Sequence, residues 1–119
     1  MRSVFVHGTL SSTDLSSLLG AIGAEGQSSV EYAFGPVRIV LLVGRKFAFR
    51  SNDYLGVVVL AASNESSQRV DVGYAGSGSG ILGAQWGAGE SIETNLYDAL
   101  VRLLQSRSLS YQEAGPVTG

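Results

Sequence analysis

Three glycines give the chain a spacing that is known from ligand binding. Gly78, Gly80 and Gly83 form the pattern Gly-x-Gly-x-x-Gly after an apparent strand. In dinucleotide-binding folds such glycines let a pyrophosphate approach the backbone at a helix N-terminus. The context argues against that function, because two more glycines follow at once and helical apolar spacing is missing. The acid found about 20 residues further on, Asp98, falls on the polar side of a predicted helix.

The glycine-rich segment 70–91 is therefore predicted to be a structural crossover or a binding loop. Bulky apolar residues such as Trp86 interrupt its glycines, which a flexible linker would lack. Structured glycine loops often carry sites, and the start of the following helix offers free amide groups to a small anion. The candidate ligand-binding residues lie in this segment and in the first strand: His7, Tyr74, Gly76, Gly78, Gly80, Trp86 and Ser91.

The composition argues against several kinds of site. Cysteine is absent and His7 is the only histidine, which removes disulfides, zinc–thiolate sites, cysteine nucleophiles and a multi-histidine metal site within one chain. A formal net charge of -2 gives no basic footprint for nucleic acid. We therefore expect no metal, no cofactor and no nucleic-acid partner, and we assign no catalytic residue.

The hydropathy pattern gives no membrane segment. A membrane-spanning helix needs roughly 18 or more consecutive apolar residues, and no run in the chain is that long. The first ten residues also lack the apolar core of a signal peptide. We expect a cytoplasmic protein.

Two stretches carry helical periodicity. Residues 11–14 (Ser-Ser-Thr-Asp) are a strong helix-start signal, and Leu15, Leu18, Leu19 and Ile22 then recur at helical spacing until Gly23. A second helix is expected from near Ser91, with its buried stripe formed by Ile92, Leu96, Ala99, Leu100 and Leu103.

The remaining pattern is that of strands. Residues 3–7 read as a short first strand, and a period of two begins near Ser29. There Val30, Tyr32 and Phe34 share one strand face. Residues 37–43 are apolar almost throughout, as in a strand covered on both faces. After them, Gly44-Arg45 is expected to form a hairpin turn or a bulge.

These elements predict an α+β domain. Its order is β-α-β(4 or 5)-α, with an antiparallel sheet of five to six strands and two helices on one face. Residues 1–106 form a single domain, and residues 107–119 form a tail that could add an edge strand. Apolar strands with helices on one side need a cover on the other, from sheet curvature, the glycine loop, the tail or a second copy. We favour the second copy and expect a homo-oligomer.

The second half of the chain resembles a family of small bacterial and archaeal domains of unknown function. The matching residues are 50–53 (Arg-Ser-Asn-Asp), 73–80 and 86–91 (Trp-Gly-Ala-Gly-Glu-Ser), which open the last helix. The family runs from Ala directly to Glu, so Gly89 is an insertion here. The resemblance implies a fold and carries no activity.

Two functional hypotheses follow. The first is a non-enzymatic structural or interaction module that self-associates through its sheet or glycine loop. The second is a small-molecule or lipid-binding domain, with a pocket for a small apolar ligand between the helices and a curved sheet in a helix-grip arrangement. An enzyme ranks third, with His7, Tyr74 and Glu90 as its candidate residues.

Overall fold

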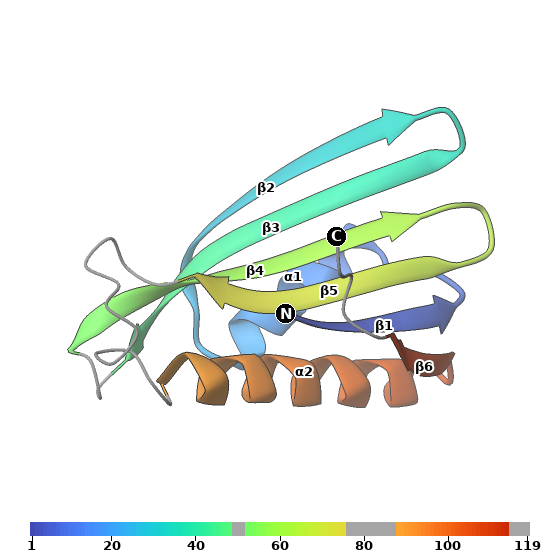
Figure 1. Cartoon of the computed structure of the whole chain (residues 1–119). Coiled ribbons are helices and arrows are strands. Elements are labelled where there is room, and N and C mark those ends of the chain that lie inside the picture. The colour runs from blue at the N-terminus through green and yellow to red at the C-terminus, as the bar shows by residue number, and fades with distance from the viewer. Residues whose placement is uncertain (49–51, 76–87, 115–119) are drawn as a thin grey trace.

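The computed structural model describes residues 1–48, 52–75 and 88–114 of the chain. A strand and a helix precede an antiparallel meander of four strands, and a helix and a strand follow it (Figure 1). In chain order the elements are β1 (Arg2–His7), α1 (Ser12–Ala21), β2 (Glu25–Phe34), β3 (Val37–Ala48), β4 (Asp53–Ser63), β5 (Gln68–Ala75), α2 (Ala88–Ser106) and β6 (Ser110–Ala114).

The six strands form one sheet in the order β2-β3-β4-β5-β1-β6, and every neighbouring pair is antiparallel. Helix α1 contacts β2 and β3, α2 contacts β3, β5 and β6, and the two helices contact each other. Both helices therefore cover the same face of the sheet. The predicted α+β class with its antiparallel sheet is confirmed.

The core fills the space between the helices and the sheet. Alternate residues of four strands point toward the helices, because successive side chains of a strand project to opposite faces. Leu15, Leu19, Leu96, Leu100 and Leu104 of the helices are completely buried against them. The strand side of this core consists of Val4, Val6, Val40, Leu42, Leu55, Val57, Val59, Ala61, Val70 and Val72.

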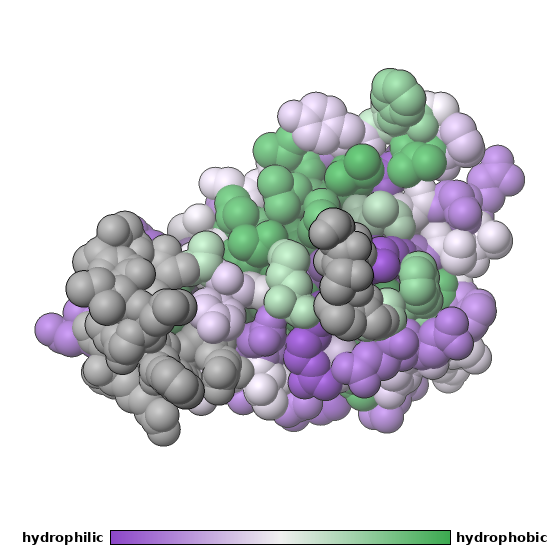
Figure 2. All heavy atoms as spheres, viewed as in Figure 1, coloured by the Kyte–Doolittle hydropathy of each residue, from purple (hydrophilic) through white to green (hydrophobic). Residues whose placement is uncertain are grey.

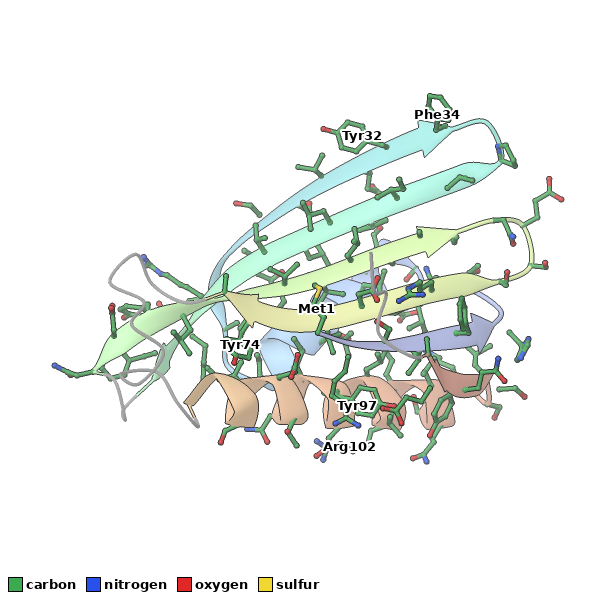
Figure 3. The ribbon with its side chains drawn as sticks, in the orientation of Figure 1. Met1, Tyr32, Phe34, Tyr74, Tyr97 and Arg102 are labelled. Carbon is green, nitrogen blue, oxygen red and sulfur yellow. The ribbon has the colours of Figure 1, made fainter. Side chains whose placement is uncertain are left out.

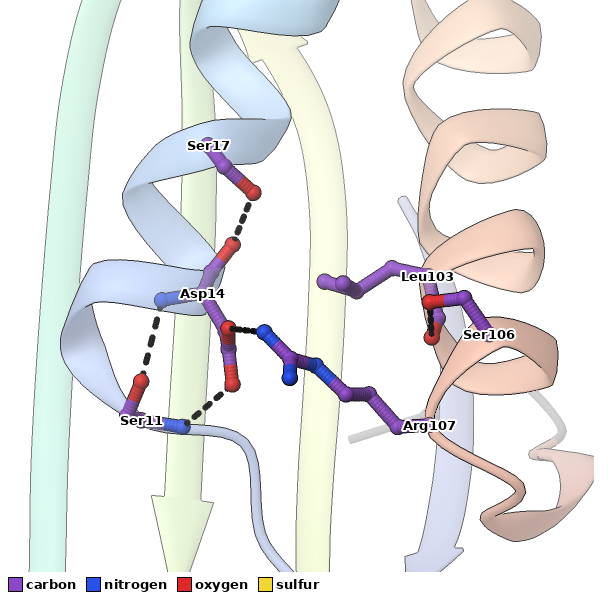
Figure 4. A network of polar contacts seen from close by, with 6 residues as sticks. All are labelled: Ser11, Asp14, Ser17, Leu103, Ser106 and Arg107. Atoms are coloured by element: carbon purple, nitrogen blue, oxygen red, sulfur yellow. Dashed lines mark hydrogen bonds and ion pairs between the residues drawn. The ribbon is translucent and has the colours of Figure 1, made fainter.

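A polar network fixes the start of α1 and ties it to α2 (Figure 4). The Ser11 hydroxyl accepts a hydrogen bond from the backbone N–H of Asp14 at 3.0 Å, and the Asp14 carboxylate accepts one from the N–H of Ser11 at 3.4 Å. This is the reciprocal capping box expected of such a start. Arg107, after the end of α2, forms an ion pair with Asp14 at 2.6 Å.

Strand β3 continues through the position where a turn or bulge was expected. Gly44 pairs with Val57 within an unbroken β3–β4 register from Arg38 to Ala48, so the hairpin-turn alternative for Gly44-Arg45 was wrong. On the other side of β3, the β2–β3 register shifts between Glu25 and Ser28, so a bulge or irregularity does lie opposite Gly44. The glycine serves a close approach instead. A Cβ atom there would lie 3.4 Å from the backbone oxygen of Glu25 and 3.5 Å from Cδ1 of Leu19. The true turn is Gly35-Pro36, where Gly35 has a φ of 59°.

The last helix begins earlier than predicted, and a strand follows it. Helix α2 begins at Ala88, slightly before the expected start near Ser91. After it, β6 pairs with β1 and takes the outer position of the sheet. The open edges of the sheet are therefore the long strand β2 and the short strand β6.

Candidate functional site

The sequence-predicted ligand residues do not all meet in one place. Gly76, Gly78, Gly80 and Trp86 lie outside the described residues. Ser91 is exposed in the first turns of α2. The remaining two, His7 and Tyr74, are both exposed.

His7 and Tyr74 belong to opposite ends of the sheet. Val6 pairs with Gln68, so Tyr74 lies about 20 Å further along β5, at about 3.3 Å per residue. Their side chains also alternate to different faces, because His7 follows the helix-facing Val6 whereas Tyr74 lies two residues after the helix-facing Val72. A single small ligand cannot contact both.

Two hollows lie beside α1. One, of about 510 Å³, separates α1 from the β2–β3 hairpin, and the other, of about 330 Å³, lies at the N-terminal end of the helix. Both are open and are lined mainly by hydroxyl, amide and carboxylate groups. Such walls do not suit an apolar ligand, because binding pockets for those are mostly apolar. The predicted apolar ligand therefore stays a prediction. The first hollow is lined by Ser12, Thr13, Ser16, Ser17, Gln27, Ser28, Ser29, Glu31 and Leu42.

The clearest surface feature is the face of the sheet opposite the helices, which we call the open face. On β2 the usual pattern is inverted. Glu31 pairs with Val40, a core residue, and therefore lies on the helix side. Val30 and Tyr32, its neighbours, must project to the open face.

The apolar residues of β2 are thus directed away from the protein's own core. Tyr32 and Phe34 are 64% and 83% exposed. Figure 3 shows both rings projecting from the upper part of β2, away from α2. On the helix side the same strand carries Ser29, Glu31 and the small residue Ala33, and Gln27 is hydrogen-bonded to Ser16 of α1. The open side of β2 is therefore apolar, and nothing among the described elements packs over that side.

The same face continues across β3 and β4. Figure 2 shows apolar side chains gathered in one patch over these strands. Leu41 and Leu60 pair with each other at its centre and are only partly buried. The open-face patch comprises Val30, Tyr32, Phe34, Val37, Ile39, Leu41, Val43, Val58, Leu60 and Ala62.

Polar groups border the patch on β5 and β1. Asp71 accepts hydrogen bonds from the Ser3 hydroxyl and from Arg69 Nε, the latter at 3.2 Å. The Arg69 guanidinium also lies 5.4 Å from the centre of the Phe5 ring. These groups satisfy one another, so this border needs no external partner. Met1 lies over Gly73 beside it, where the absence of a Cβ atom leaves room.

A second border lies at the far end of β3 and β4. Phe47 and Tyr54 pair edge to face with ring centroids 5.3 Å apart. The Arg45 guanidinium lies 5.0 Å from the centre of the Tyr54 ring. The open face therefore has an uncharged apolar centre and a border that contains arginine and aromatic side chains. This distribution is typical of protein–protein interfaces.

One further cluster lies on the helix side, at the opposite edge of the sheet. The Arg2 guanidinium lies 3.6 Å from the centre of the Tyr97 ring and pairs with Glu113 at 3.4 Å. Burial raises the pKa of the Tyr97 phenol above its ordinary value of 10.0, the Glu113 carboxylate adds to this rise, and Arg2 opposes it. The cluster joins α2, β1 and β6.

Comparison of the chain with protein-family models, curated proteins and solved structures found no match. The resemblance at residues 86–91 accordingly stays a prediction. Within residues 1–48, 52–75 and 88–114, histidine, aspartate and glutamate side chains form no group that could hold a metal ion. The helices described here are too short or too polar to cross a membrane.

Sequence reasoning predicted that the sheet face away from the helices needs a cover, but it named none of the open-face residues as a site, although one signal was present. The alternation of Val30, Tyr32 and Phe34 was visible in the sequence. What the sequence did not show was the face to which these residues point. That depends on the pairing of Glu31 with Val40.

Proposed function

We propose that this protein is a non-enzymatic module that self-associates by packing its open face against the open face of a second copy. The observation that carries the proposal is the inverted pattern of β2. A strand exposed to water on both sides has no reason to place Val30, Tyr32 and Phe34 on one face and Ser29, Glu31 and the small Ala33 on the other. Two sheets that pack face to face bury such residues between them.

The size of the open face suits a stable dimer. Four strands about 4.8 Å apart, each about 8 residues long at about 3.3 Å per residue, give a flat footprint of roughly 500 Å². Side chains that project from this footprint enlarge the accessible area. A standard interface buries about 800 Å² on each partner. The flat footprint of the β2–β5 part of the face is therefore of the same order as a standard interface before the projecting side chains are counted.

The distribution of charge favours a second copy as that partner. A two-fold axis through the centre of the patch brings Leu41 and Leu60 of one copy near the same residues of the other. No like charges meet there, because the charged residues Arg45, Arg69 and Asp71 lie at the borders. A cytoplasmic location is part of the same proposal.

The mass of the native particle tests the proposal. At micromolar concentration we expect native mass spectrometry to give at least twice the chain mass of 12.4 kDa. A chain that ends at Ala114 is the control for coverage by residues 115–119. It is expected to retain the same assembly. A particle of one chain mass for the full-length protein would contradict the proposal.

A further inference from the structure

The outer edge of β2 carries a second inference, which rests on the proposed function. β2 pairs only with β3, and all ten of its residues, from Glu25 to Phe34, are exposed. An edge strand presents a row of unpaired N–H and C=O groups to any other strand. Proteins normally protect such edges with proline, charged side chains, bulges or short strands.

The regular part of β2 has few of these protections. The register is irregular only between Glu25 and Ser28. Residues 28–34 (Ser-Ser-Val-Glu-Tyr-Ala-Phe) contain neither proline nor lysine, and Glu31 is the only charge. The other edge strand, β6, is half as long, with five residues against ten. The β2 edge is therefore the one available for pairing.

We propose that β2 pairs antiparallel with β2 of another copy, so that two face-packed dimers join into a four-chain assembly. Edge pairing joins two six-stranded sheets into one continuous sheet, with its two-fold axis perpendicular to the sheet. Face packing uses an axis within the plane between two sheets. Perpendicular axes of these two kinds together give the closed symmetry of a tetramer.

The edge and the open face are continuous, which supports a second copy as the occupant. Val30, Tyr32 and Phe34 reach the open face from the edge strand itself. When two β2 strands pair, their open faces lie on the same side of the joined sheet, so the two open-face patches adjoin along one seam. A foreign strand without this alternation would leave the merged patch incomplete.

Side-chain chemistry also selects the register. Residues directly opposite each other in a sheet share a face. A two-fold axis at Glu31 would set two carboxylates against each other, which is unfavourable. An axis at Val30 sets Val30 against itself and Glu31 against Ser29, whose hydroxyl can donate to the carboxylate. The second register is the one we expect.

Backbone direction identifies the residue to change. The two-residue turn Gly35-Pro36 makes Phe34 and Val37 a hydrogen-bonded pair. By the alternation of an antiparallel ladder, the N–H of Glu31 then points outward from β3. Glu31→Pro removes this N–H without disturbing the β2–β3 ladder, as proline is tolerated at such edge positions. Glu31→Thr is the matched control, because it removes the same charge and keeps the N–H.

Native mass spectrometry at micromolar concentration separates the two interfaces. We expect four chains for the wild type and Glu31→Thr, two for Glu31→Pro, two for the open-face variant Tyr32→Glu, and one for the double variant Glu31→Pro/Tyr32→Glu. A two-chain wild type that Tyr32→Glu reduces to one chain would overturn edge pairing and leave the proposed function standing. A two-chain wild type that Glu31→Pro dissociates and Tyr32→Glu does not would overturn the proposed face packing and leave edge pairing standing.

A disulfide test does not depend on how well the proline variant folds. The chain has no cysteine, so Val30→Cys introduces a single thiol. We expect oxidation to link two copies through it, because the two Cβ atoms at the axis lie about 4.5–5.5 Å apart. Phe34→Cys, away from the axis, is expected to remain unlinked. Absence of the Val30→Cys link, or an equally strong link through Phe34→Cys, would overturn the edge register.

Discussion

Val30 and Leu41 lie directly opposite each other across the β2–β3 ladder, on the face of the sheet turned away from both helices. The next pair along the ladder, Glu31 and Val40, lies on the helix side. In β2 the apolar residue is therefore on the open side and the charged residue on the covered side. This arrangement is the basis for assigning the open face to a partner.

The Asp14 carboxylate has two roles, which predicts unequal effects of two substitutions. It stabilises the start of α1 and pairs with Arg107 at 2.6 Å. Asp14→Ala should lower the free energy of unfolding by about 1–2 kcal/mol, because it removes the helix-start contact and the ion pair together. Arg107→Ala removes only a half-exposed ion pair and should cost less than about 1 kcal/mol. Urea unfolding measures both, and equal losses would show that the helix-start contact contributes nothing.

Two glycines predict opposite effects of the same substitution. Gly8 has a φ of 137°, and a Cβ atom there would lie 2.7 Å from Cδ2 of Leu109. Gly8→Ala should therefore destabilise the protein by about 1–3 kcal/mol. Gly20 lies within α1 with open space around its Cβ position. Gly20→Ala should stabilise it by about 0.5–1 kcal/mol. Thermal unfolding of the two variants checks both signs, and a destabilised Gly20→Ala would contradict the helix assignment there.

The raised pKa of Tyr97 predicts that the protein loses stability at alkaline pH. Its pKa is raised in the folded protein, chiefly by burial, so the folded state binds the phenolic proton more tightly than the unfolded state. The contribution of Tyr97 is therefore complete below about pH 10, the ordinary tyrosine pKa, and is lost as the pH rises through the folded value.

Substitution by phenylalanine isolates this contribution. Between about pH 9 and about pH 11, the free energy of unfolding should fall less in Tyr97→Phe than in the wild type, because phenylalanine has no proton to release. A Tyr97→Phe profile that coincides with the wild-type profile would contradict the assignment.

The arrangement of the elements could be predicted from the sequence because local patterns determine it. The capping residues from Ser11 to Asp14 mark the start of α1, and the period of two after Ser29 marks the meander. At Gly44 only the hairpin-turn alternative was wrong, because a glycine in a strand can serve either a turn or a close approach. The backbone oxygen of Glu25 and the side chain of Leu19 near this position distinguish the two.

The candidate site could not be predicted in the same way, because it depends on contacts between distant residues. The direction of Tyr32 follows from the register of β2 on β3 and from which side the helices occupy. The polar border likewise joins Ser3 to Asp71 across two strands that are far apart in the chain. The order of residues along the chain shows neither the direction of Tyr32 nor the contact between Ser3 and Asp71.

The measurement that tests self-association through the open face most directly compares two neighbouring residues of β2. Tyr32 and Ala33 are both exposed and project to opposite faces. Native mass spectrometry of Tyr32→Glu and Ala33→Glu places the same charge on the open side and on the helix side. We predict that Tyr32→Glu halves the number of chains in the particle while Ala33→Glu keeps the wild-type number. An unchanged particle in Tyr32→Glu, or equal dissociation in both variants, would contradict assembly through the open face.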